Sequence, residues 1–399
     1  MKFPTVAGFK GINNRLDPTQ MGLQWQLQAD NSLCDDAGFL VRRPGATAVL
    51  ANSADLYGTP EGRLWIVTTD GRLQEVGADG VAHERASGFY GAPFAWTTLG
   101  YATFALSETA AWAIYPDRVT AWGIPALSAP TIRLAAGSFA PGTYLAACSL
   151  VAPDGRLGGC SGVASMALNG QGVTITSAPV AGYTTRLYLS EPDGATLYSA
   201  GLLPPSGSVT LAALPTLGAR LTTQNRYPPP LGGRIAAQGN RICVAIWEPE
   251  HDRSVLYWSQ PDAPHWFALD TDYQLVAGQV MLLASVGLTL LIGTDRAIYI
   301  DSPGAPRQTI AAFGALPDTL ARIGPDKIAF WSERGLCVFP PLELPTDAAL
   351  VPDNRRVTTG AMLDHAGSSY YVTVQRGPSQ PRNRPPYLPL PITVQEANA

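Results

Sequence analysis

The side chains that most often carry out chemistry are sparse in this chain of 399 residues. No two of its four histidines, His83, His251, His265 and His365, lie at the spacing of metal ligands. His251 sits in the run Glu248-Pro249-Glu250-His251-Asp252, whose composition is typical of an exposed turn. A solvated loop explains this histidine better than a catalytic role, which would need partner side chains. The sequence therefore predicts no metal site and no cofactor.

Motifs for nucleophilic and phosphate chemistry are absent from the sequence, since neither Gly-x-Ser-x-Gly nor a P-loop occurs. Acidic pairs such as Asp35-Asp36 and Asp270/Asp272 are present. A glycosidase needs two carboxyl groups about 5–9.5 Å apart across a cleft, which spacing along the chain does not establish. The Asp box of sialidases is also absent. We predict a non-enzymatic protein without catalytic residues, and a glycan-active enzyme is the less favoured alternative.

The five cysteines, Cys34, Cys148, Cys160, Cys243 and Cys337, are scattered and include no Cys-x-x-Cys pair. This argues against zinc and against a disulfide framework. Cys148 and Cys160 lie six residues on either side of Asp154, so a hairpin centred there would place them opposite each other. Directly opposed residues of antiparallel strands are about 4.5–5.5 Å apart at Cα, which a disulfide tolerates. Two interpretations remain: two buried thiols in a reducing cytoplasm, or one bridge.

Trp258, Trp266 and Trp331 stand at the ends of predicted strands, beside Ser or His. Aromatic side chains at such positions pack the core in most proteins. A platform on which sugars stack is the second interpretation.

The composition indicates a β-rich protein with many turns and few charges. Charged residues make up 15% of the chain, below the typical ~25%, which fits a surface covered by partners or one rich in Ser, Thr and Gln. The 40 glycines and 35 prolines are spread along the chain, as in a protein with frequent turns. The net charge is −4 and no basic run occurs, which argues against a dedicated nucleic-acid site. We see no signal peptide and no membrane-spanning segment, so we expect assembly in a cytoplasm without membrane insertion.

Short strands recur in pairs around tight turns. The first clear pair, residues 63–68 and 72–76, flanks Thr69-Asp70-Gly71. Equivalent pairs are predicted at residues 234–237 with 241–247, 288–292 with 297–300 and 327–331 with 336–339. Such units, repeated without a WD40 or kelch signature, predict an all-β fold, a six- or seven-bladed β-propeller. Residues 39–42 are the candidate strand for closing its ring.

Changes in composition and in the predicted strands divide the chain into five parts. Residues 126–215 are poor in charge and carry about seven predicted strands, as in an immunoglobulin- or fibronectin type III-like β-sandwich. We therefore predict that this sandwich is inserted in the propeller and that extended arms stand at both ends. The predicted parts are an N-terminal arm, 1–38; the first propeller part, 39–125; the insert, 126–215; the second propeller part, 216–376; and a Pro-rich C-terminal arm, 377–399.

The chain resembles phage tail nozzle, hub and stabilization-type structural proteins. These typically open with a Gly-Leu-Asn-x-Arg-like element, an Asn-containing strand and Gly-x-x-x-x-Arg-x-Gly. The matching residues here are Gly11-Ile12-Asn13-Asn14-Arg15, with Ile12 for the usual Leu, then Asn31, and then Gly38, Arg42, Arg43, Pro44 and Gly45. Pro141-Gly142-Thr143-Tyr144 and Asp154-Gly155-Arg156 look like the fibronectin-like insert of these proteins, and Phe330-Trp331-Ser332 resembles one of their blades.

The resemblance implies a structural virion protein that forms a homo-oligomeric ring, often hexameric, around the channel through which DNA leaves. It implies other tail proteins as partners, transient proximity to viral DNA, contacts with fibre or receptor-binding proteins, and no catalytic residues. We assign the terminal arms to neighbour contacts, with Arg384, Pro385, Pro386 and Tyr387 in the C-terminal one. A receptor- or carbohydrate-binding propeller at the tail tip is the alternative.

Overall fold

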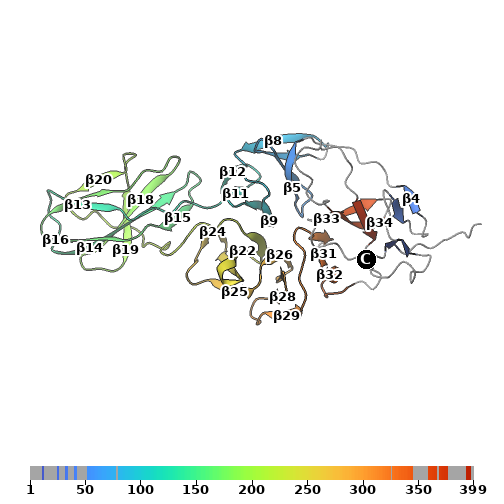
Figure 1. Ribbon diagram of the computed structural model, residues 1–399. Helices are drawn as coiled ribbons and strands as arrows, with labels where there is room; N and C mark the ends of the chain where they lie inside the picture. Colours follow the sequence, from blue (N-terminus) through green and yellow to red (C-terminus); the bar gives the residue numbers. More distant parts are fainter. Residues whose placement is uncertain are drawn as a thin grey trace, which may run out of the picture.

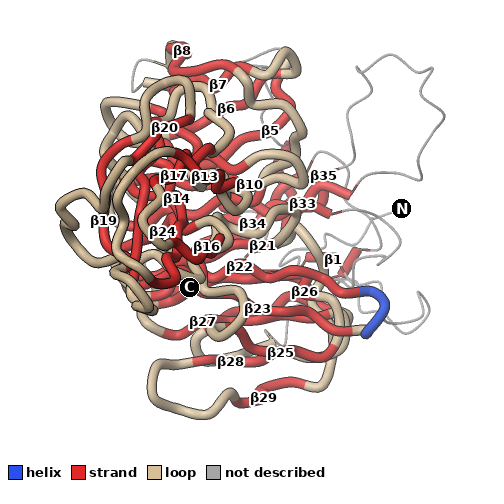
Figure 2. Tube along the Cα trace, turned by 90° about the vertical axis from the view of Figure 1, so that its left-hand side faces the viewer, coloured by secondary structure: helices blue, strands red, loops and turns tan. Residues whose placement is uncertain are grey.

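The computed structural model describes residues 52–344 except 78–79 and 325. Outside this range it describes only strand segments, at 11–12, 25–26, 32–34, 40–42, 358–365, 368–375 and 392–396. Within these residues the fold is all-β, as predicted, with one 3₁₀ turn, η2 (Pro249–His251), which joins β22 and β23 (Figure 2). None of the described helical segments has the length and apolar character needed to cross a bilayer.

Six antiparallel sheets follow one another around a ring and form a β-propeller (Figure 1). The first sheet contains β5 (Ser53–Gly58), β6 (Leu64–Thr68), β7 (Arg72–Val76) and β8 (Ala82–Ser87). The second contains β9 (Ala95–Leu99), β10 (Ala102–Leu106), β11 (Ala111–Ile114) and β12 (Val119–Ala121). The third contains β21 (Arg234–Gln238), β22 (Arg241–Glu248), β23 (Arg253–Gln260), β24 (Ala263–Phe267) and β25 (Tyr273–Ala277). The fourth contains β26 (Val280–Val286), β27 (Thr289–Thr294), β28 (Ile298–Asp301) and β29 (Gln308–Ala311). The fifth and sixth contain β30 (Ala321–Ile323), β31 (Lys327–Ser332) and β32 (Gly335–Phe339), and β33 (Thr358–His365), β34 (Ser368–Gln375) and β35 (Ile392–Glu396).

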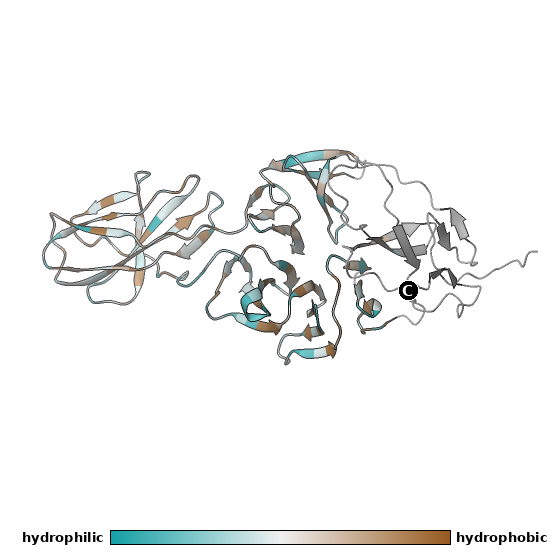
Figure 3. Ribbon diagram, viewed as in Figure 1, coloured by the Kyte–Doolittle hydropathy of each residue, from teal (hydrophilic) through white to brown (hydrophobic). Residues whose placement is uncertain are grey.

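The middle strands of these sheets bury both of their faces. In β10, Phe104 packs between the second and third sheets, while its neighbour Ala105 packs between the first and second. In β31, Phe330 and Trp331 divide in the same way between the two sheets on either side. Successive side chains of a strand point to opposite faces, so a continuous apolar run fits a strand covered on both sides. In Figure 3, brown apolar residues lie along several strands of the third and fourth sheets, whereas the outer strand β8 is mostly teal and white.

The first strand of each sheet lies nearest the axis of the ring. There β21 packs against both β9 and β26. The hydroxyl of Thr97 on β9 accepts a hydrogen bond of 2.9 Å from the backbone N–H of Ala237 on β21. Arg234, also on β21, forms an ion pair of 2.5 Å with Asp318, which precedes the fifth sheet. The second and third sheets are therefore neighbours in space, although about 110 residues separate them in sequence.

The intervening residues form a β-sandwich of two sheets, which projects from one side of the propeller (Figure 1). One sheet has the order β13 (Thr131–Ala135), β17 (Gly172–Thr176) and β20 (Ser208–Leu211). The other has the order β15 (Leu157–Cys160), β14 (Gly142–Val151), β18 (Thr184–Ser190) and β19 (Leu197–Leu202), with β16 (Ala164–Leu168) also paired to β14. Tyr144, Ile175 and Leu187 belong to the core between the sheets. The likeness to fibronectin type III domains rests on the sequence alone.

The predicted closing strand is wrong. Residues 40–42 form β4 (Leu40–Arg42), which pairs with β3 (Ser32–Cys34) and not with the last sheet. Because only a short segment joins β3 to β4, their pairing costs little loop-closure entropy. The third strand of the last sheet is β35, from the predicted C-terminal arm, paired with β34. The remaining described strands, β1 (Gly11–Ile12) and β2 (Trp25–Gln26), form a parallel pair.

The bridged interpretation of Cys148 and Cys160 is also wrong, because both are free thiols. A register shift between Ser149 and Val151 places Cys160 opposite Ser149. A shift of one residue turns a side chain to the other face of the sheet. Cys148 consequently lies in the sandwich core, while Cys160 belongs to a separate cluster on the outer face of the same sheet.

We expect the four described thiols to react slowly in the folded protein and fully in denaturant. Burial raises the pKa of Cys148, Cys160 and Cys337 to about 11 and raises the pKa of Cys243 further, so little thiolate exists at pH 8. The measurement is a timed titration with a thiol-reactive chromophore at pH 8, with and without urea and without reductant. A total of three thiols in urea would show a bridge and contradict the structure.

Candidate functional site

The residues singled out in the sequence fall almost entirely outside the described part of the chain. Only the backbone of Arg42, in β4, is described. The others lie outside the described residues and are Asn13, Asn14, Arg15, Asn31, Gly38, Arg43, Pro44, Gly45, Arg384, Pro385, Pro386 and Tyr387.

Solvent exposure or packing explains the positions of His251, Trp258, Trp331 and Trp266. The side chain of His251 in η2 is 58% exposed, as predicted for a turn. Trp258 and Trp331 are buried between propeller sheets, which confirms the packing interpretation for both. Trp266 instead reaches the sandwich, where its indole N–H donates a 2.6 Å hydrogen bond to the carbonyl of Leu157. Within the described ranges, no group of three or more His, Cys, Asp or Glu side chains is arranged to hold a metal ion.

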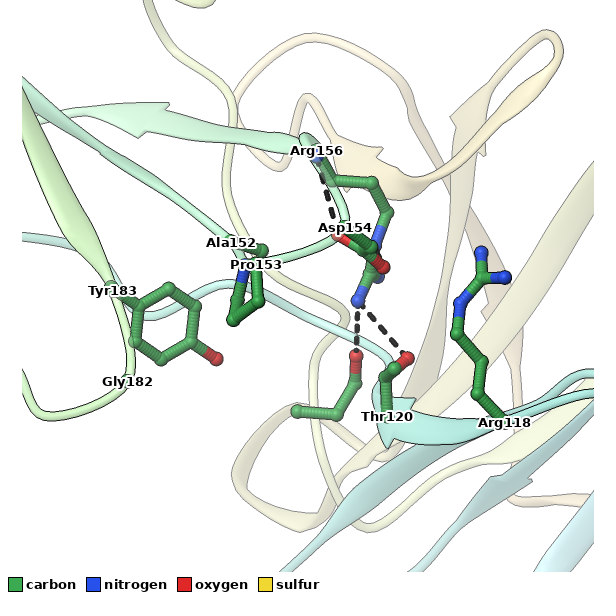
Figure 4. Close-up of a pocket in the computed structure, with 9 residues that line it drawn as sticks. Arg118, Thr120, Ala152, Pro153, Asp154, Arg156, Gly182 and Tyr183 are labelled. Carbon is green, nitrogen blue, oxygen red and sulfur yellow. Dashed lines mark hydrogen bonds and ion pairs between the residues drawn. The ribbon is translucent and has the colours of Figure 1, made fainter.

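The junction between propeller and sandwich gathers the strongest polar interactions that link the two units. The tip of the β14–β15 hairpin, Pro153-Asp154-Gly155, reaches back onto β12 of the second sheet, the outer strand from which the chain leaves the propeller (Figure 4). Gly155 turns the chain with a φ of +85°, a conformation that suits glycine. The residue after the turn, Arg156, is thereby directed at the propeller.

The guanidinium of Arg156 binds three consecutive residues of the propeller. Its Nη1 donates to the carbonyl of Trp122 at 2.9 Å, and its Nη2 donates to the Thr120 hydroxyl and the Ala121 carbonyl, both at 3.0 Å. Its Nε donates to the Asp154 carboxylate at 2.7 Å. Only 16% of this side chain and 13% of the Asp154 side chain are exposed. The planar fork of an arginine suits such a site because it presents several donors in fixed directions.

The return segment secures the sandwich from the other side. Leu221 packs on the outer face of the five-stranded sheet, and its N–H donates to the carbonyl of Leu197 at 2.8 Å. The N–H of Cys160 donates to the carbonyl of Thr223 at 3.1 Å. A Cβ at Gly159 would lie 1.8 Å from the Arg226 carbonyl oxygen, so only glycine permits this approach. The two units are therefore joined along both connecting segments.

Electrostatics at the junction follow from burial and from Arg156. Burial alone would raise the pKa of Asp154, but the hydrogen bonds and charge of Arg156 outweigh it and lower that pKa. His265, beside Trp266, is mostly buried, and this burial, with the nearby Arg156 charge, lowers its pKa to about 4. His265 is therefore neutral at neutral pH.

A pocket of about 590 Å³ opens where the two units meet. Figure 4 shows Tyr183 of the sandwich on one wall, Arg118 of the propeller on the opposite wall, and Asp154 with Arg156 between them. The guanidinium of Arg118 stacks over the ring of Tyr115 at 4.5 Å, and its Nη1 binds Asp117. Sequence reasoning missed this site because its walls come from three separate segments, β12, the β14–β15 turn and the loop before β18, which only the packing of the two units brings together.

No protein-family model matches the chain, and no curated protein matches it. Among solved structures, it is similar to YCF48 bound to D1 peptide, with 9% identity and a TM-score of 0.34 over 88% of this chain and 94% of that one. It is also similar to the extracellular domain of a putative one-component system, BT4673 of B. thetaiotaomicron, with 13% identity and a TM-score of 0.29 over 80% of this chain and 36% of that one. A third similarity is to PorZ of the type-IX secretion system of Porphyromonas gingivalis, with 13% identity and a TM-score of 0.20 over 88% of this chain and 54% of that one. At these TM-scores, none of them supports a statement about function.

Replacing Arg156 with methionine should loosen the junction. The stem remains, but four hydrogen bonds are lost, and the mostly buried Asp154 carboxylate loses its charged partner and keeps only the backbone N–H of residue 156. We expect the free energy of unfolding to fall by about 2–4 kcal/mol in urea denaturation, and small-angle X-ray scattering to show a wider range of sandwich positions. The matched control is Arg133→Met on the exposed face of β13. Unchanged stability and scattering in R156M would contradict the role given to this side chain.

The depressed pKa of His265 should make stability fall in mild acid. Between the ordinary value of 6.5 and the folded value of about 4, the unfolded chain binds the extra proton and the folded chain does not. Stability is thus fully present above pH ~6.5 and decreases as the pH falls through this window, by at most about 3 kcal/mol. Urea denaturation from pH 4 to 8 measures this slope, which His265→Gln should flatten. An equal slope in both proteins would assign the pH dependence to other groups.

Proposed function

We propose that this protein is a non-enzymatic structural subunit of a bacteriophage tail, in a nozzle, hub or tail-tip ring. The sequence resemblance suggests this function, and the fold agrees with what that resemblance implies. The observation that carries the proposal is the insertion of a β-sandwich between two adjacent propeller sheets, joined to both by tight connections. In such a subunit, the propeller forms the ring and the sandwich projects from it toward neighbouring proteins.

The use of charge within the described propeller fits a scaffold. On the first sheet Arg63, Arg72 and Arg85 pair with acidic residues of the same sheet. Exposed pairs of this kind contribute little stability, and they also leave few free charges to bind ligands. On the outer strand β25, Tyr273 and Leu275 stand 47% and 45% exposed on one face. Apolar side chains at an outer strand are suited to contact with a neighbouring subunit.

Imaging tests this function directly. We expect negative-stain images of the purified chain to show rings, and mass photometry to show a homo-oligomer. We also expect an antibody against the sandwich to label the tail of virions that contain the protein. A chain that stays monomeric at micromolar concentration and is absent from purified virions by mass spectrometry would refute the proposal.

A further inference from the structure

We infer that the pocket at the junction of propeller and sandwich binds a neutral saccharide. The inference does not rest on the proposed structural role. Arg118 and Tyr183 take no part in the contacts of Arg156 that tie the two units together, whereas Thr120 and Asp154 bind Arg156 and also line the pocket. Its volume of about 590 Å³ lies within the range of small-molecule sites. Its walls come from both units, so it exists only when the sandwich is held against the propeller.

The polar groups of the junction divide into two classes. Arg156 is not available to a ligand, because its Nε, Nη1 and Nη2 all donate to protein oxygens. Arg118 is available, because its hydrogen bonds in the described part of the chain use Nη1 alone, and 45% of its side chain is exposed. The Tyr183 hydroxyl likewise makes no hydrogen bond to any described residue, and Figure 4 shows it directed toward the pocket. Donors therefore remain on both walls for a ligand.

Acceptors are also present. Each oxygen of the Asp154 carboxylate accepts a hydrogen bond from Arg156, from its backbone N–H or its Nε, and retains a further lone pair. The Thr120 hydroxyl accepts from Arg156 and keeps its own proton to donate. A ligand with several hydroxyl groups, each both donor and acceptor, matches this mixture better than one that only donates or only accepts.

The charge around the pocket favours a neutral ligand. The guanidinium groups of Arg118 and Arg156 are balanced by the carboxylates of Asp117 and Asp154, which they bind at 3.0 and 2.7 Å. Each arginine of the pocket lining thus already pairs with a carboxylate, which weakens its attraction for a phosphate or a ligand carboxylate. A free phosphate or a nucleotide is therefore disfavoured.

Aromatic rings supply the apolar contacts. Tyr183 forms one wall, and Tyr115 lies beneath Arg118 near the other. Tyr101, 78% exposed, lies beyond, with its ring centroid 6.1 Å from that of Tyr115. Sugar rings offer C–H faces that pack on aromatic side chains while their hydroxyl rims bind polar groups. Tyr101 packs beside Tyr115, outside the residues that line the pocket, so we expect an oligosaccharide that reaches its exposed ring to bind more tightly than a single sugar.

The test is a glycan array that carries neutral and acidic oligosaccharides, probed with the full chain and followed by titration calorimetry on the best neutral ligand. We expect Tyr183→Phe, which removes one hydroxyl, to weaken binding about 3–10-fold, and Arg118→Ala or Tyr183→Ala to weaken it at least about tenfold. Tyr101→Ala should weaken binding of the oligosaccharide but not of its terminal monosaccharide.

The matched control is Tyr90→Ala, an exposed tyrosine that follows β8 of the first sheet, which should bind as the unaltered chain does. Thermal denaturation of each variant separates lost binding from lost folding, and Tyr183→Phe keeps the test valid if Tyr183→Ala is unfolded. The inference is overturned if no neutral glycan binds at millimolar concentration, if only acidic glycans bind in a salt-sensitive way, or if folded Arg118 and Tyr183 variants bind unchanged. Ring formation and virion labelling do not depend on these outcomes.

Discussion

The structure depends on the burial of both faces of the middle strands. A strand such as β31 carries large apolar side chains on each face, Phe330 on one and Trp331 on the other, so its sheet is stable only between two neighbours. Each sheet requires the next, and a succession of right-twisted sheets curves into a ring. The same requirement explains where an insert is tolerated. The sandwich leaves after the outer strand β12 and returns to the inner strand β21, where a connection must run between sheets in any case.

The junction shows a second constraint, which is that buried polar groups must be satisfied. Where the two units meet, the carbonyls of Ala121 and Trp122 accept hydrogen bonds from Arg156, and the carbonyl of Leu157 accepts one from Trp266. The low dielectric of the same region keeps His265 neutral and strengthens the Arg156–Asp154 pair. The lowered pKa of His265 and the strength of the Arg156–Asp154 pair thus both follow from burial at the junction.

Two kinds of function can coexist on such a scaffold. The donors of Arg156, which hold the sandwich in place, are all bound to protein oxygens. Arg118 and Tyr183 keep donors that a ligand can use, and the ring of Tyr101 is exposed. The pocket is lined by residues of both units, beside the contacts of Arg156. Binding would then depend on assembly of the two units and not on either alone.

The sequence by itself determined the all-β class, the propeller, the inserted sandwich and most hairpins, because alternation, turn residues such as Asp70-Gly71 and apolar runs are local signals. It did not determine strand partners that are distant in sequence. The pairing of β35 with β34, the one-residue shift that separates Cys148 from Cys160, and the contacts of Arg156 depend on contacts between surfaces and on a bulge. The junction pocket was likewise decided only by tertiary structure, because Arg118, Asp154 and Tyr183 meet through the packing of two units, which no spacing along the chain encodes.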